Sequence, residues 1–109
     1  MSELTLEQEY IAEEICSRIL RDNQYGSCRS KISLSGLDGR FNELVRKTIY
    51  YYDHPDEKQR KRGWALRRQL YDDFGISVIF FFQVFLIIWQ IIKLYLDLKS
   101  DKEFMARLT

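Results

Sequence analysis

The sequence predicts an all-α protein with one long apolar helix near its C-terminus. In two N-terminal segments, apolar residues recur at three- and four-residue steps, which is the periodicity of amphipathic helices. From Phe74 to Ile92 there is no charged residue, although charged residues make up 30% of the 109-residue chain. We therefore expect two amphipathic helices and a basic juxtamembrane helix, which leads into an apolar helix that crosses a membrane.

The first amphipathic helix is expected from about Thr5 to Gln24. Thr5 and Gln8 have the spacing of a capping box, in which each side chain bonds the other residue's backbone N–H. Gly26 is the expected C-terminal cap. The Ser- and Gly-rich stretch 27–40 then predicts a loop. The apolar stripe of this helix consists of Ile11, Ala12, Ile15, Cys16, Ile19 and Leu20.

The second amphipathic helix follows the loop, with Asp38 as its expected cap. It should end at Asp53 and His54, because the residue before Pro55 disfavours the helical conformation. Together the two helices form a predicted partner-binding region, 1–54. The apolar face of the second helix consists of Phe41, Leu44, Val45, Thr48, Ile49 and Tyr52.

A basic helix is expected over 55–73, with Pro55 at its first position and a break at Gly75. Its basic residues are candidates to contact lipid headgroups or nucleic-acid phosphates. Near an anionic membrane surface, each contributes about 1 kcal/mol of attraction. The net charge of only +1 makes a dedicated nucleic-acid binder less expected than a lipid-binding protein. The basic residues are Lys58, Arg60, Lys61, Arg62, Arg67 and Arg68.

The apolar helix is expected over 74–96, followed by a short polar tail, 97–109. Its uncharged stretch rises by about 28 Å, close to the roughly 30 Å of a bilayer's hydrocarbon core. The mean hydropathy of this stretch is about +2.3, in the range of membrane-spanning segments. The remaining helices are too few to enclose it within a small monomer, so we expect lipid around it.

Two features of this helix predict its contacts and orientation. Gln83 and Gln90 are seven residues apart and share one face, so we expect them to contact another helix within the membrane. Six basic residues lie within the twenty residues before the apolar stretch and four follow it, and this excess predicts that the N-terminus is on the cytoplasmic or equivalent side. The four that follow are Lys93, Lys99, Lys102 and Arg107.

The sequence contains no pattern typical of catalysis or metal binding. His54 is the only histidine, and the carboxylates around it lack a zinc-site spacing. Cys16 and Cys28 form no CxxC pair, and we expect them to be reduced thiols. The acidic N-terminus is typical of neither a signal peptide nor a transit peptide. We therefore expect no enzyme, no metal and no cofactor.

The predicted function is that of a non-catalytic, single-pass membrane accessory or assembly subunit. Its expected partners are membrane lipid and the other protein subunits of a larger complex. Tyr50 and Tyr51 are candidate partner contacts, because tyrosine is frequent at binding surfaces. One alternative is a soluble all-α interaction module that buries its apolar helix in a homo-oligomer core. The other is a small RNA-binding protein that uses residues 58–68.

Overall fold

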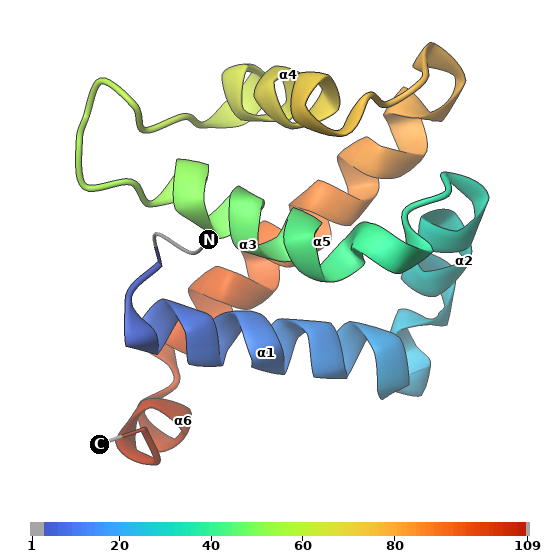
Figure 1. Cartoon of the computed structure of the whole chain (residues 1–109). Helices are drawn as coiled ribbons and strands as arrows, with labels where there is room; N and C mark the ends of the chain where they lie inside the picture. The colour runs from blue at the N-terminus through green and yellow to red at the C-terminus, as the bar shows by residue number, and fades with distance from the viewer. Residues whose placement is uncertain (1–3, 109) are drawn as a thin grey trace.

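The computed structural model describes residues 4–108, and every regular element in that range is helical (Figure 1). The all-α prediction is therefore confirmed. The 3-10 helices are η1 (Asn23–Tyr25), η2 (Asp38–Arg40) and η3 (Val78–Phe80). The α-helices are α1 (Leu6–Arg21), α2 (Gly26–Leu34), α3 (Phe41–Tyr52), α4 (Gly63–Phe74), α5 (Phe81–Ser100) and α6 (Lys102–Ala106).

The start of α1 matches the predicted capping box. The Gln8 backbone N–H donates to Thr5 Oγ1 at 3.1 Å, and the Thr5 N–H donates to Gln8 Oε1 at 3.0 Å. Two of the four free N–H groups at this helix end are thus satisfied. The predicted apolar stripe faces the core, except that Leu20 is 50% exposed. Its buried members are Ile11, Ala12, Ile15 and Ile19.

The predicted loop over 27–40 is wrong in its first half, where the chain forms α2. The side chain of Arg29 provides a physical reason. Its Nη1 donates to the carbonyls of Ile19 at 2.9 Å and Asp22 at 2.7 Å, which are free groups at the end of α1. Ile32 is 2% exposed and packs into the core. One buried residue and one arginine thus fix a helix whose composition is typical of a loop.

Two predicted capping residues have other roles. Gly26 is the first residue of α2, and Asp22 is the C-cap of α1. Asp38 is the first residue of η2, and Arg40 is the N-cap of α3. Both predictions are wrong because a 3-10 helix lies between the α-helices at each place: η1 separates α1 from α2, and η2 separates α2 from α3.

α3 buries the face that its periodicity predicts. The helix ends at Tyr52, directly before Asp53 and His54, as the position of Pro55 predicts. Its buried residues are Phe41, Leu44, Val45, Thr48 and Ile49.

The predicted basic helix begins at Gly63 and not at Pro55, so the expected helix over 55–73 is wrong in its first part. Residues 55–62 form turns instead. Nε of Arg62 donates to the carbonyl of Tyr52, the last residue of α3, at 3.0 Å, and Nε of Arg60 donates to the carbonyl of His54, just beyond the helix, at 2.9 Å. These bonds hold the segment against α3, and Gly63 starts α4 with a positive φ of 58°.

The predicted break at Gly75 is confirmed. Gly75 is the C-cap of α4 and has the left-handed conformation, with φ 62° and ψ 42°. An L-residue reaches this region only at a cost of about 1–2 kcal/mol.

We expect Gly75→Ala to lower the free energy of unfolding by about 1 kcal/mol, measured by chemical denaturation. No atom lies within 4 Å of a Cβ added at Gly75, so the cost is that of the backbone conformation alone. Gly39→Ala is the matched control, because its Cβ also meets open space and its φ is not positive. The control should be neutral or stabilising by about 0.4–1 kcal/mol. Equal effects of the two substitutions would contradict the left-handed cap.

α5 passes through the middle of the domain and packs against α1, α2, α3 and α4 (Figure 1). The radius of gyration is 13.5 Å, close to the value of about 13 Å for a compact chain of this length, so α5 does not project away. We expected the other helices to be too few to cover α5. This expectation is wrong for the face of α5 that packs against these four helices. The buried residues of α5 are Val84, Ile87, Ile88, Ile91, Leu94, Tyr95 and Leu98.

Candidate functional site: an apolar surface and a polar network

The region where α4, η3 and the first half of α5 meet exposes large apolar side chains, which we call the apolar surface. A single exposed apolar residue is ordinary in a soluble protein, whereas a contiguous group marks a binding surface. The members of the apolar surface are Trp64 (62% exposed), Val78 (75%), Ile79 (75%), Phe82 (71%) and Trp89 (48%).

Aromatic contacts join the parts of the apolar surface. The ring centroids of Trp64 and Tyr71 are 6.4 Å apart, and Tyr71 stacks on Phe81 with centroids 4.4 Å apart. The Tyr71 hydroxyl also donates to the Phe81 carbonyl at 2.8 Å. These contacts hold the start of α5 against α4, so Trp64 and the neighbouring η3 belong to one surface.

The outward face of α5 is apolar at the start of the helix and carries mainly polar residues towards its end. Phe82 and Trp89 are seven residues apart and therefore share this face. Beyond Trp89 the same face carries Leu96, which is 43% exposed, and the exposed polar residues Lys93, Asp97 and Ser100. Lys93 Nζ lies 5.3 Å from the centroid of the Trp89 ring. The two most exposed apolar residues of α5, Phe82 and Trp89, thus lie in its first half.

Arg67 lies beneath the apolar surface as a buried cation. It is 7% exposed, and its guanidinium carbon lies 4.0 Å from the centroid of the Phe85 ring. Nη1 donates to the Gly63 carbonyl at 3.0 Å, whereas Nε is buried and has no hydrogen-bond partner in the described structure. None of the ion pairs within residues 4–108 includes Arg67. Burial lowers the pKa of its guanidinium, as expected for a cation without a carboxylate partner.

Gln83 and Gln90, the predicted helix-contact residues, are both half-buried. Gln90 lines a cleft of about 200 Å³ between α2 and α5, together with Tyr25, Cys28 and Trp89. The Oε1 atom of Gln83 is buried and accepts no hydrogen bond from the described residues.

The six basic residues of the predicted lipid- or phosphate-binding run do not form one surface. Arg60 donates to the carbonyl of His54, and Arg62 donates to the carbonyl of Tyr52 in α3. Arg62 also lies over the Tyr52 ring at 4.2 Å and reaches Asp53 at 3.8 Å. The run therefore divides between a turn and α4. Lys58, Arg62 and Arg68 are exposed, Arg60 and Lys61 are half-buried, and Arg67 is buried.

Tyr50 and Tyr51, the predicted partner contacts, are half-buried at the end of α3. The Tyr51 hydroxyl donates to Asp73 Oδ2 at 2.8 Å, which ties α3 to α4. Burial, together with this hydrogen bond, raises the pKa of Tyr51 to about 12. The Tyr50 hydroxyl lies 3.2 Å from His54 Nε2, and His54 Nδ1 accepts the Asp56 N–H at 3.0 Å. Both ring nitrogens of His54 thus have partners, one in α3 and one in the turn that follows it.

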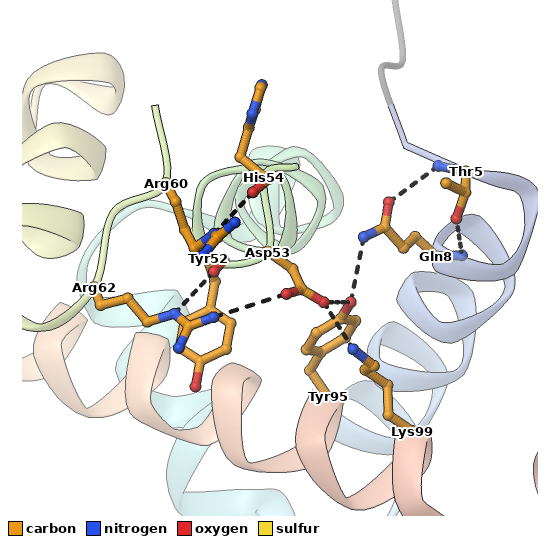
Figure 2. A network of polar contacts seen from close by, with 9 residues as sticks. All are labelled: Thr5, Gln8, Tyr52, Asp53, His54, Arg60, Arg62, Tyr95 and Lys99. Atoms are coloured by element: carbon orange, nitrogen blue, oxygen red, sulfur yellow. Dashed lines mark hydrogen bonds and ion pairs between the residues drawn. The ribbon is translucent and has the colours of Figure 1, made fainter. Parts of the chain in front are cut away.

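A network of polar contacts centred on Asp53 joins α1, α3 and α5 (Figure 2). Asp53 Oδ2 accepts hydrogen bonds from the Tyr95 hydroxyl at 2.7 Å and from Lys99 Nζ at 2.8 Å. The Tyr95 hydroxyl in turn accepts from Gln8 Nε2 at 3.3 Å. Gln8 also completes the capping box of α1, so the network connects that helix end to the second half of α5.

The network shifts the proton affinities of its members. Burial alone would raise the pKa of Asp53, but the hydrogen bonds from Lys99 and Tyr95 outweigh it and lower the pKa overall. Burial and the hydrogen bond to Asp53 raise the pKa of Tyr95. Sequence reasoning missed the network, because its bonds join residues 42, 46 and 87 positions apart.

The residues with metal-binding or redox chemistry are dispersed. Within residues 4–108, no three His, Cys, Asp or Glu side chains are grouped as a metal site would require. Cys16 and Cys28 are free, half-buried thiols, and burial raises the pKa of both. Cys16 Sγ lies 3.6 Å from Asn42 Oδ1.

η3 and α5 together, Val78–Ser100, are long and apolar enough to cross a membrane, as the composition predicts. The apolar 18-residue window of this stretch has a mean hydropathy of 2.0, and 33% of that window is buried in the domain. By length and composition, this is the one such helix among the described residues. No family model, no curated protein and no solved structure matches the chain.

Proposed function

We propose that this protein is a non-catalytic, membrane-bound accessory subunit, which helps to assemble a larger membrane complex. The observation that carries the proposal is the exposure of Val78, Ile79 and Phe82 at the start of a helix that is apolar enough to cross a membrane. Fully burying a side chain of this size is worth about 1.5–3 kcal/mol. Three of them together favour a lipid-bound or partner-bound state over an isolated one in water.

The distribution of charge supports a position on the cytoplasmic or equivalent face of the membrane. Six basic residues lie within the twenty residues before the apolar stretch and four lie after it, and basic residues are retained on the cytoplasmic side. That leaflet is also the anionic one, which attracts exposed cations such as Lys58 and Arg68. The helices α1–α4 then lie outside the hydrocarbon core.

The proposed assembly role rests on the two glutamines of α5. Gln83 has a buried amide oxygen with no hydrogen-bond donor in the described part of the chain, and such an unmade bond costs about 1–3 kcal/mol. Gln90 borders the cleft between α2 and α5. A helix of a partner subunit that docks along this side of α5 would supply donors to both. Tyr50 and Tyr51 would extend the contact region at the end of α3.

Membrane fractionation of a tagged chain in cells, followed by purification of bound subunits, tests the proposal. The wild type should sediment with membranes and bring partner proteins with it. Gln83→Leu combined with Gln90→Leu should still sediment with membranes but retain several-fold less partner protein. Gln59→Leu, in the exposed turn before α4, is the matched control and should retain the partners. Recovery of the wild-type chain in the soluble fraction alone would refute the proposal.

A soluble, self-associating interaction module is the second candidate function. It is favoured by the buried face of α5, which is covered by α1, α2, α3 and α4 as in a water-soluble domain. The apolar surface would then be buried between copies of the chain. A monodisperse oligomer without detergent, together with no affinity for lipid vesicles, would establish this candidate in place of the first.

A further inference from the structure

We infer that the protein binds an anionic bilayer from one side, with the apolar surface inserted into the headgroup region and α5 still packed within the domain. The inference rests on the proposed function and specifies how the membrane is bound. The surface that inserts consists of Trp64, Val78, Ile79, Phe82 and Trp89.

The packing of α5 favours insertion from one side over crossing. A crossing helix would have to leave α1 and α3, which would expose buried residues such as Ile15 and Leu44 to water. The neighbouring helices cannot accompany it, because their outer faces carry charged residues, which are costly in hydrocarbon. The Asp53 network also holds Tyr95 and Lys99, in the second half of α5, against α3. Within η3 and α5, only η3 and the outward face of the first half of α5 are free to enter lipid.

The chemistry of the apolar surface favours a bilayer over a protein partner. The apolar surface contains both Trp64 and Trp89, and tryptophan is enriched where a membrane meets water. Lys93 lies over the Trp89 ring, where its ammonium group can extend towards headgroups. Residues 55–78 contain six basic and four acidic side chains, so this part of the chain has a net charge of +2, whereas the rest has −1. The charge therefore complements an anionic leaflet.

Arg67 supplies an independent observation that points to a phosphate group. It is more than nine-tenths buried beneath the apolar surface, it pairs with no carboxylate among the described residues, and its Nε has no hydrogen-bond partner. Guanidinium groups prefer the oxygens of phosphates and carboxylates. A lipid phosphate drawn between α4 and α5 would provide the acceptor that the domain itself does not.

Vesicle binding tests the inserted surface. Purified wild-type protein should co-sediment with phosphatidylcholine vesicles that contain phosphatidylserine, and more weakly with pure phosphatidylcholine. Ile79→Glu with Phe82→Glu should lower the affinity at least about tenfold, because two inserted side chains are replaced by charges. Leu6→Glu with Leu34→Glu is the matched control, since these residues are 71% and 65% exposed on α1 and α2. The control should bind like the wild type, and circular dichroism should show both variants folded.

The headgroup contact has its own test. Arg67→Met should reduce the preference for phosphatidylserine-containing vesicles over neutral ones severalfold. Arg18→Met, on the distant surface of α1, makes the same change in net charge and should reduce the preference less. Equal losses in the two variants would overturn the contact with Arg67.

The two tryptophans of the chain both lie in the apolar surface and report its depth. On binding, their fluorescence should shift to shorter wavelength and be quenched by lipids brominated near the headgroup. Alkaline carbonate should release the protein, as it releases proteins bound to one leaflet. Binding that resists carbonate, with the C-terminus protected from external protease, would replace our inference by a crossing helix and leave the proposed function standing. Failure of the wild type to bind any vesicle would count against the proposed function itself.

Discussion

Ile91→Ala should lower the free energy of unfolding by about 2–5 kcal/mol, the range for truncation of a buried aliphatic side chain. Ile91 is fully buried on the face of α5 that packs inside the domain. The substitution leaves a cavity that the surrounding helices fill only in part. For a domain of about 100 residues, whose total stability is about 5–15 kcal/mol, this loss is large. Denaturant unfolding, followed by circular dichroism, measures it.

Phe82→Ala is the control on the opposite face of the same helix. Phe82 is 71% exposed, so its truncation should change the unfolding free energy by no more than about 0.5 kcal/mol. The pair therefore distinguishes a packed α5 from a helix that leaves the domain. If Ile91→Ala were as mild as Phe82→Ala, α5 would not be part of the folded core, and the one-sided mode of membrane binding would fail with it.

Asp53→Ala should destabilise the protein by about 1–3 kcal/mol, because it leaves the Tyr95 hydroxyl and the Lys99 ammonium without their acceptor. Tyr95 is 2% exposed, so water cannot readily replace the lost partner. In a double-mutant cycle with Tyr95→Phe, the two changes should be non-additive by about 0.5 kcal/mol or more. Asp97→Ala, an exposed carboxylate on α5, is the control and should have little effect. Additive effects in the cycle would contradict the hydrogen bond between Asp53 and Tyr95.

The same network predicts how stability depends on pH. The pKa of Asp53 is lower in the folded protein than in the unfolded chain, where it is about 3.9. The unfolded state therefore binds the proton more readily, and the contribution of Asp53 is present above about pH 4 and lost as pH falls through its folded pKa. Asp53→Ala should reduce this acid loss of stability. If the unfolding free energy of Asp53→Ala falls as steeply with decreasing pH as that of the wild type, the lowered pKa of Asp53 is contradicted.

The raised pKa values of Tyr51 and Tyr95 predict a loss of stability at alkaline pH, in contrast to the loss at acid pH that Asp53 predicts. The pKa of Tyr51 is raised to about 12 by its burial and its bond to Asp73, so its contribution is fully present below about pH 10 and is lost as pH rises through the folded value. Burial and the bond to Asp53 raise the pKa of Tyr95 as well. Neither Asp53 nor Tyr95 therefore changes its protonation in the neutral range, so the hydrogen bond that joins them is retained there.

Part of the candidate site could be read from the sequence. The uncharged stretch predicts a helix long and apolar enough to cross a membrane, and η3 and α5 together have this length and composition. The burial of Arg67 could not be predicted, because the same residue in a basic run is ordinarily solvated. The Asp53 network was equally hidden, since each of its bonds joins residues that are far apart in the chain.

The sequence by itself determined α1 with its capping box, the buried face of α3, the break at Gly75 and the apolar character of α5. These features depend on groups within one or two helical turns of each other, which composition and spacing specify directly. Only the tertiary structure decided that α2 forms, that residues 55–62 turn back on α3, and which face of α5 lies inside. An apolar helix has no intrinsic inside face: the packing of four other helices against it selects one, and the residues left on the other face form the surface available to lipid.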